Sequence, residues 1–149
     1  MSQGTSAHTD IVTCPHCGAR NRLPAGSAGV PRCGKCRHAL PWLTTATDDD
    51  FNAVVLDAKL PVLVDLWAPW CGPCRIVEPG VQHVAKEFAG RLKVTKVNVD
   101  AAPHIAQHYR AQSIPMLLWI RDGEVRRQQV GALPPPALVD WVTAALDGR

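Results

Sequence analysis

The sequence predicts an α/β fold with a mixed central sheet, preceded by a small cysteine-rich segment. After residue 46, strand-like and helix-like patterns alternate and close with a hairpin signal and a last helix. Residues 1–46 instead hold four of the six cysteines and show little apolar periodicity. Apolar residues make up 46% of the 149, which is enough for one packed core. No apolar run reaches the roughly 18 residues that would predict a membrane-spanning helix.

The first elements follow from composition. The cysteine-rich segment cannot bury enough apolar surface to fold unaided, so it needs a cross-link or a metal. Residues 44–47 resemble a linker. The acidic residues 48–50 predict a helix start, because carboxylates are favourable at a helix N-terminus. Residues 51–58 carry apolar side chains at helical spacing, which predicts a short helix.

The later elements follow from the period of their apolar residues. Alternating or near-continuous apolar runs predict strands, and apolar residues three or four apart predict helices. Asp122-Gly123 predicts a hairpin turn. The expected order is a strand at 62–67, a helix at 73–89 whose apolar residues include Ile76, a strand at 92–99, a short helix at 103–109, strands at 116–120 and 124–130, and a helix after the prolines at 134–136.

The six cysteines form three Cys-x-x-Cys pairs, at 14/17, 33/36 and 71/74. An even number of cysteines could form a disulfide framework in a secreted protein. However, the first ten residues are polar and do not resemble a secretory signal, and the regular spacing favours metal or redox chemistry. We therefore expect a cytoplasmic protein whose thiols are kept reduced.

The two N-terminal pairs predict a zinc ribbon. Cys14 and Cys17 are separated from Cys33 and Cys36 by 15 intervening residues, and four thiolates in this spacing suit one structural zinc ion. Gly18 and Gly34 are expected to permit the tight turns. Two further redox pairs, a disulfide-linked loop or an iron site are the alternatives. The predicted domains are a ribbon at 1–43 and an α/β domain at 44–149, each with its own source of stability, so that a chain starting near residue 47 should still fold.

The third pair predicts a redox centre. Cys71 and Cys74 follow an apolar strand and open a helix. Unpaired N–H groups and the helix dipole stabilise a thiolate at that position, so Cys71 is expected to be the nucleophile. Pro73 lies where the helix needs no N–H donor. Cys74 is expected to be more buried, and to resolve the mixed disulfide formed at Cys71.

Five blocks of residues resemble the thioredoxin family, and they occur in the family's order over about residues 47–149. The four N-terminal cysteines resemble its bacterial zinc-containing branch, thioredoxin 2. The blocks are VDLWAPWCGPC at 64–74, KVNVD at 96–100, SIP at 113–115, DGEV at 122–125 and VGAL at 130–133. The resemblance implies the thioredoxin fold and a protein-disulfide reductase that thioredoxin reductase recharges with electrons from NADPH.

The resemblance also implies roles for individual residues. Asp65 would exchange a proton with Cys74, and burial in an apolar strand would raise its pKa towards neutrality. Lys96 would lie near Asp65. Ile114-Pro115 would form a cis-proline turn facing the redox pair. Met116 stands where the family commonly has threonine. An apolar docking surface for substrates would comprise Trp70, Gly72, Pro73, Ile114, Pro115, Gly131 and Ala132.

The charge distribution leaves other functions open. Residues 1–46 hold five basic residues and one acid, so the ribbon could bind an acidic partner or nucleic acid. Trp42 is its only aromatic residue for base stacking, which argues against nucleic acid. The zinc thiolates could also act as a redox sensor. The favoured partners are thioredoxin reductase and disulfide-containing proteins, with no membrane association and a monomeric chain.

Overall fold

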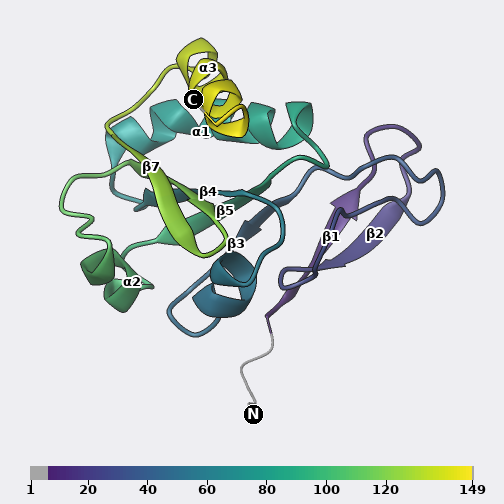
Figure 1. The fold of residues 1–149 in the computed structure, drawn as a ribbon, viewed down its shortest axis with the longest axis horizontal. Helices are drawn as coiled ribbons and strands as arrows, with labels where there is room; N and C mark the ends of the chain where they lie inside the picture. Colours follow the sequence, from purple (N-terminus) through teal and green to yellow (C-terminus); the bar gives the residue numbers. More distant parts are fainter. Residues whose placement is uncertain (1–6, 149) are drawn as a thin grey trace.

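The computed structural model describes residues 7–148. Its centre is a five-stranded sheet in the order β3-β5-β4-β6-β7 (Figure 1). Strands β3, β5 and β4 are parallel, and β6 and β7 complete the sheet as an antiparallel hairpin. The sheet strands are β3 (Leu43–Thr45), β4 (Val62–Trp67), β5 (Lys93–Asn98), β6 (Met116–Arg121) and β7 (Glu124–Val130).

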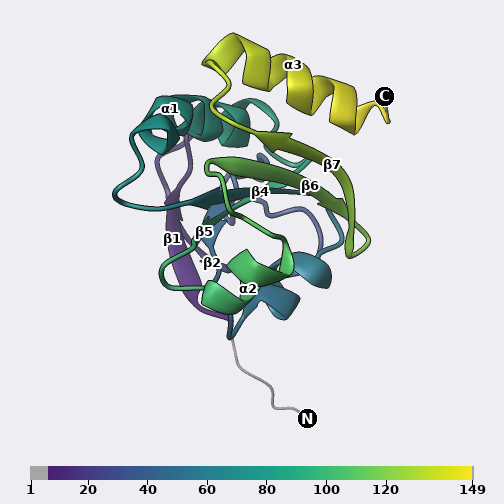
Figure 2. The same cartoon turned by 90° about the vertical axis from the view of Figure 1, so that its left-hand side faces the viewer.

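Helices cover both faces of this sheet. Helices α1 (Gly72–Glu87) and α3 (Pro135–Leu146) lie on one face, whereas the π-helical turn η1 (Asn52–Leu56) and α2 (Pro103–His108) lie on the other (Figures 1 and 2). Alternate residues of β4 belong to the two cores: Leu63 packs in the cluster with α1 and α3, while Val64 packs in the opposite cluster. Since side chains alternate along a strand, Asp65 points to the α1 side with Leu63. None of the helices within 7–148 is long and apolar enough to cross a membrane.

The structure confirms the predicted α/β fold and its element order, with three local differences. Residues 44–47, expected to be a linker, include most of β3, whose backbone pairs with β5. The helix expected at 51–58 is only the turn η1. Ile76 was expected on the apolar side of its helix but is 59% exposed. The three differences share a cause. Strand pairing, helix length and side-chain burial each depend on neighbouring elements that are distant in the sequence.

The N-terminal segment forms a separate two-stranded antiparallel sheet of β1 (Thr9–Thr13) and β2 (Arg20–Pro24). Its small core contains Cys14, Cys33 and Leu40. Such a core is too small to hold the segment together alone, as composition predicted.

The ribbon packs against the α/β domain around a buried lysine. Lys93 of β5 is 0% exposed, and its ammonium donates hydrogen bonds to the carbonyls of Ala25 in the ribbon and Val54 in η1. The same ammonium lies 4.3 Å from the centroid of the Trp42 ring. Burial lowers the pKa of Lys93 to about 8. Ala25 also belongs to the main core cluster, so the two parts share buried surface.

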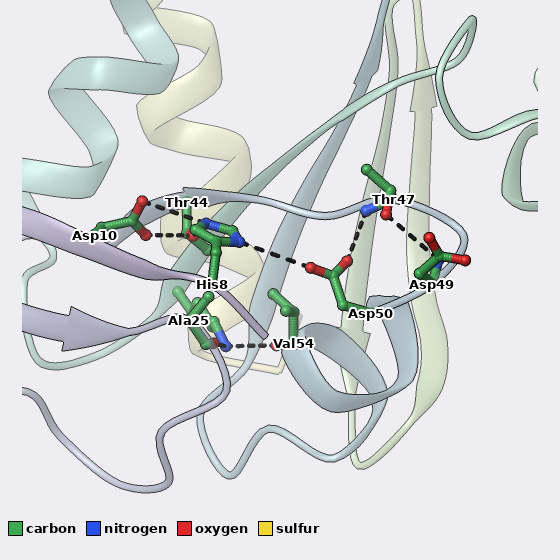
Figure 3. Close-up of polar contacts among 9 residues, drawn as sticks. His8, Asp10, Ala25, Thr44, Thr47, Asp49, Asp50 and Val54 are labelled. Carbon is green, nitrogen blue, oxygen red and sulfur yellow. Dashed lines mark hydrogen bonds and ion pairs between the residues drawn. The ribbon is translucent and has the colours of Figure 1, made fainter. Parts of the chain in front are cut away.

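A polar network next to this contact joins the same two parts (Figure 3). The Thr44 hydroxyl donates to Asp10 Oδ2 at 2.6 Å, which joins β3 to β1. The His8 ring lies 3.3 Å from Asp10 Oδ1 and 3.7 Å from Asp50 Oδ2, so it bridges the ribbon and the residues before η1. Thr44 and Asp50 are buried and His8 is exposed, so the network ties the ribbon to β3 and to the residues before η1 at the edge of their shared surface.

Candidate redox and metal sites

The redox pair lies where β4 leads into α1. A disulfide joins Cys71 and Cys74, with Cys71 as the N-cap of the helix. The Cys74 N–H donates to Cys71 Sγ at 3.2 Å, so an N–H group of the first helical turn points at this sulfur. A thiolate at Cys71 would receive the same N–H and the positive end of the helix dipole. Cys74 was expected to be more buried than Cys71, but both cysteines are 4% exposed.

The loop before β6 faces this pair. The Ile114–Pro115 peptide bond is cis, and the Ile114 carbonyl oxygen lies 3.7 Å from Cys71 Sγ. The Gly131 N–H donates to the Pro115 carbonyl at 2.9 Å, which brings the end of β7 to the same place. Ile114 is half-buried and Pro115 is buried.

Several predicted docking residues surround the pair at the surface. Trp70 is 68% exposed, and its indole N–H donates to Asp100 Oδ2 at 3.0 Å, which holds the ring in place. Gly72 and Pro73 are exposed, and Gly131 and Ala132 are half-buried. Exposed Ile76 on α1, two residues after Cys74, adds apolar surface that the sequence did not predict. Met116 is buried in the main core.

Asp65 is a buried carboxyl on the α1 side of the sheet. It is 1% exposed, and its Oδ1 has no hydrogen-bond partner among the described residues. Burial raises the pKa of Asp65 to about 7, while the positive charge of Lys96 opposes this rise and the negative charge of Glu78 adds to it. A carboxyl with this pKa can both accept and release a proton near neutral pH.

Lys96 lies beside Asp65, as predicted, but its ion-pair partner is Glu78. Asp65 and Lys96 are paired residues of the parallel strands β4 and β5. The Lys96 ammonium forms an ion pair with Glu78 Oε1 and lies 4.5 Å from the centroid of the Trp67 ring. Glu78 was not predicted as a site residue. Its position four residues after Cys74 was a usable signal, because residues i and i+4 share one helix face.

A small pocket opens beside these groups. It has a volume of about 160 Å³ and gives access to Cys74 next to the charged side chains. Its lining residues are Trp67, Ala68, Pro69, Cys74, Arg75, Glu78 and Lys96.

The ribbon cysteines form a second cluster. The sulfur atoms of Cys14, Cys17, Cys33 and Cys36 all lie within 4.8 Å of one another. Cys14 Sγ is 3.6 Å from Cys36 Sγ, and Cys17 Sγ is 3.6 Å from Cys33 Sγ. Sulfurs around a tetrahedral zinc ion, each at about 2.3 Å from it, would be roughly 3.8 Å apart. The cluster therefore has the donor type and the spacing of a closed metal site.

The backbone prepares this cluster for thiolates. Hydrogen bonds from the N–H groups of Cys36 and Lys35 lower the pKa of Cys33 to about 5, and the Cys17 N–H likewise lowers the pKa of Cys14. The His38 N–H also favours a thiolate at Cys36, but burial and the three neighbouring thiols raise the pKa of Cys36 to about 12 in the absence of an ion. Gly18 has φ +78°, as expected for a tight turn. In the second turn the positive φ belongs to Arg37, at +69°, and not to Gly34 as expected. The left-handed residue in each turn thus follows the second cysteine, and its N–H donates to the carbonyl of the first.

A cysteine pair at the start of a helix, facing a cis-proline turn on this sheet order, defines the class of thioredoxin-fold proteins. The chain belongs to the thioredoxin family, whose sequence model, described as Thioredoxin, matches residues 43–144.

Named relatives agree with this membership. The chain is 40% identical over 108 residues to "Thioredoxin M-type, chloroplastic" of Spinacia oleracea, covering 72% of this chain and 60% of that protein. It is 44% identical over 95 residues to "Thioredoxin" of Haemophilus influenzae, covering 64% of this chain and 89% of that protein. It is 48% identical over 92 residues to "Thioredoxin 1" of Nostoc sp., covering 62% and 86%. The chain thus spans about 60% of the length of the chloroplast relative.

Proposed function

We propose that this protein reduces disulfide bonds in other proteins. The observation that carries the proposal is the position of Cys71: a helix N-cap whose sulfur receives the Cys74 N–H and lies 3.7 Å from the Ile114 carbonyl. The helix end favours the thiolate, and the Ile114–Pro115 loop offers backbone groups to a substrate chain beside it.

The reaction would proceed in two exchanges. The Cys71 thiolate attacks one sulfur of the substrate disulfide, the substrate S–S bond breaks, and one substrate thiolate leaves. Cys74 then gives its proton to the Asp65 carboxylate and attacks Cys71 Sγ, which releases the second substrate thiolate. The substrate thiolates take up the proton from Asp65 and one from water. Two electrons pass from the dithiol to the substrate, and the Cys71–Cys74 disulfide remains.

The docking surface favours extended, apolar segments of protein. Exposed Trp70 and Ile76 flank the nearly buried cysteine pair, so a substrate must bring its disulfide to the surface or unfold locally. We propose that Gly72, Pro73, Ile114, Pro115, Gly131 and Ala132 complete this surface. Thioredoxin reductase, with electrons from NADPH, is the proposed partner that restores the dithiol.

We propose one structural zinc ion in the ribbon, held by Cys14, Cys17, Cys33 and Cys36, as in the thioredoxin 2 branch. Four protein thiolates leave no open coordination position, so the ion would stabilise the ribbon and take no part in the redox chemistry. Thiolates that bind zinc must stay reduced, so we propose the cytoplasm as the compartment. We also propose that the working unit is a monomer.

The proposal is tested by reduction of insulin with NADPH and thioredoxin reductase. The wild-type chain should turn over, and Cys71→Ser should lose activity completely because no thiolate remains to attack. The control is Lys86→Ser, an exposed residue in the last turn of the same helix, which should keep turnover of the redox pair. Near-normal turnover by Cys71→Ser would show that the nucleophile is assigned wrongly.

A further inference from the structure

The charged groups around Asp65 are arranged in an unexpected way. Lys96 is the residue paired with Asp65 across β4 and β5, yet its ammonium forms its ion pair with Glu78 of α1. Asp65 Oδ1 is left without a hydrogen-bond partner within residues 7–148. The basic side chain nearest to the buried acid is therefore held by a different carboxylate.

Two contacts hold the Lys96 ammonium in this position. Glu78 Oε1 is its ion-pair partner, the Trp67 ring lies beneath it at 4.5 Å, and all three residues line the pocket next to Cys74. Lys96 and Glu78 side chains are 18% and 32% exposed, so the pair lies at the boundary between the pocket and solvent. Without Glu78, the flexible lysine stem would let the ammonium turn towards Asp65, because a buried carboxylate without a hydrogen-bond partner attracts a positive charge that has lost its own partner.

We propose that Glu78 is a positioning residue of the redox centre: it holds Lys96 at the pocket rim and so leaves Asp65 free to exchange a proton with Cys74. This inference rests on the proposed function for its kinetic consequence, but not for its electrostatic one. The charged groups that act on Asp65 are Lys96 from β5 and Glu78 from α1. Cys74 of α1 lines the same pocket as Lys96 and Glu78. Its partner on β6 is the apolar Leu117, which brings no charge.

The sign of the effect follows from these groups. Removing the Glu78 charge takes away a negative neighbour and releases the Lys96 ammonium, and both changes favour the ionised form of Asp65. The protonation midpoint of Asp65 should therefore fall in Glu78→Gln, by roughly half a pH unit for a partly exposed ion pair. A lower midpoint makes Asp65 a weaker base but ionises it at lower pH, so the pH profile of mixed-disulfide resolution should move to lower pH.

The first experiment is a carboxyl titration of Asp65 by carbon NMR in the oxidised full-length protein, where neither redox cysteine titrates. Glu78→Gln should lower the midpoint, whereas Glu87→Gln, which removes a carboxylate that contacts His83 at the other end of α1, should not. The shift should be smaller in a Lys96→Met background, because no ammonium remains to be held. An unchanged or raised midpoint would overturn the proposal, and so would an equal shift with and without Lys96.

The second experiment measures the pH profile of mixed-disulfide resolution in single turnovers with a small aromatic disulfide. The profile of Glu78→Gln should move in the same direction as its Asp65 midpoint, and an unmoved profile would overturn the role in proton exchange. If the wild-type chain itself reduced no disulfide, the proposed function would fail, while the NMR titration would still decide the electrostatic role of Glu78.

Discussion

Asp65→Asn should stabilise the folded protein by an amount that grows with pH. Asp65 is 1% exposed, and burial raises its pKa from the ordinary 3.8 to about 7. Between these two values the unfolded chain has lost the proton that the folded chain still holds, so the stability of the wild-type protein falls as pH rises through this window. Asparagine has no charge to bury, so the variant escapes this loss.

The magnitude follows from the size of the shift. The pKa rises by about three units, and each unit corresponds to about 1.4 kcal/mol, so the full effect is about 4 kcal/mol above pH 7. About two of these units lie between pH 5 and pH 8, so the advantage of the variant should grow by about 3 kcal/mol over that interval. The buried amide has its own desolvation cost, which is the same at every pH. The diagnostic quantity is therefore the change with pH.

The assay is urea unfolding of the oxidised full-length chain, followed by far-UV circular dichroism at pH 5, 6.5 and 8. Asp140→Asn is the matched control, because Asp140 is exposed on α3 and should give the same stability difference at every pH. A stability difference for Asp65→Asn that stays constant from pH 5 to pH 8 would refute the argument, since Asp65 would then ionise as an ordinary carboxyl.

Four further predictions concern the cysteines, the proton exchange and the ribbon. Cys74→Ser should perform one exchange and stop as a mixed disulfide at Cys71, which mass spectrometry of trapped substrates would detect; free protein alone would argue against Cys74 as the resolving thiol. Asp65→Asn should slow resolution several-fold at pH 7 but not at pH 9, where Cys74 ionises unaided, so equal slowing at both would exclude proton transfer. The isolated protein should contain one zinc ion per chain by elemental analysis and Cys33→Ser should lose it, whereas a metal-free wild type would contradict the ribbon assignment. A chain starting at Leu43 should fold and reduce insulin but unfold at a lower urea concentration, because Ala25 leaves the shared core; a midpoint equal to that of the full chain would show that the ribbon contributes no stability.

The sequence predicted the features that are encoded locally. Three apolar or alternating runs identified β4, β5 and β6, because a strand buried on both faces is largely apolar along its length. The Asp122-Gly123 hairpin signal identified β7. The Cys-x-x-Cys spacings identified both cysteine clusters, since two cysteines three residues apart lie close in any tight turn or first helical turn. Arg37 was missed because arginine gives no sign that its backbone will adopt a positive φ.

The features that were missed depend on partners distant in the sequence. Lys93 reads as a polar position in an alternating strand, and only the carbonyls of Ala25 and Val54 explain why it is buried. Glu78 reads as a surface residue of a helix until Lys96 is placed beside it. Ile76 and Val77 are both apolar, and the neighbours of α1 decide that Val77 is buried and Ile76 exposed. Such choices are set by packing, which the local pattern does not contain.

The ribbon and the redox domain meet at β3, and this junction decides how separate they are. Leu43–Thr45 adds the edge strand of the central sheet (Figure 1). The preceding Trp42 packs on the Lys93 ammonium, which also donates a hydrogen bond to the ribbon. The sequence predicted a linker at 44–47, where the chain could be cut. A cut near residue 47 would in fact remove β3 and leave the hydrogen-bonding groups of β5 exposed along a new sheet edge. A cut before Leu43 keeps the sheet complete and exposes only the surface that the ribbon covers. Loss of metal from the cysteine cluster would act on the same junction, because the loosened ribbon is continuous in sequence with the edge strand. The ribbon therefore covers one edge of the redox domain, and the proposed zinc ion would hold that cover in place.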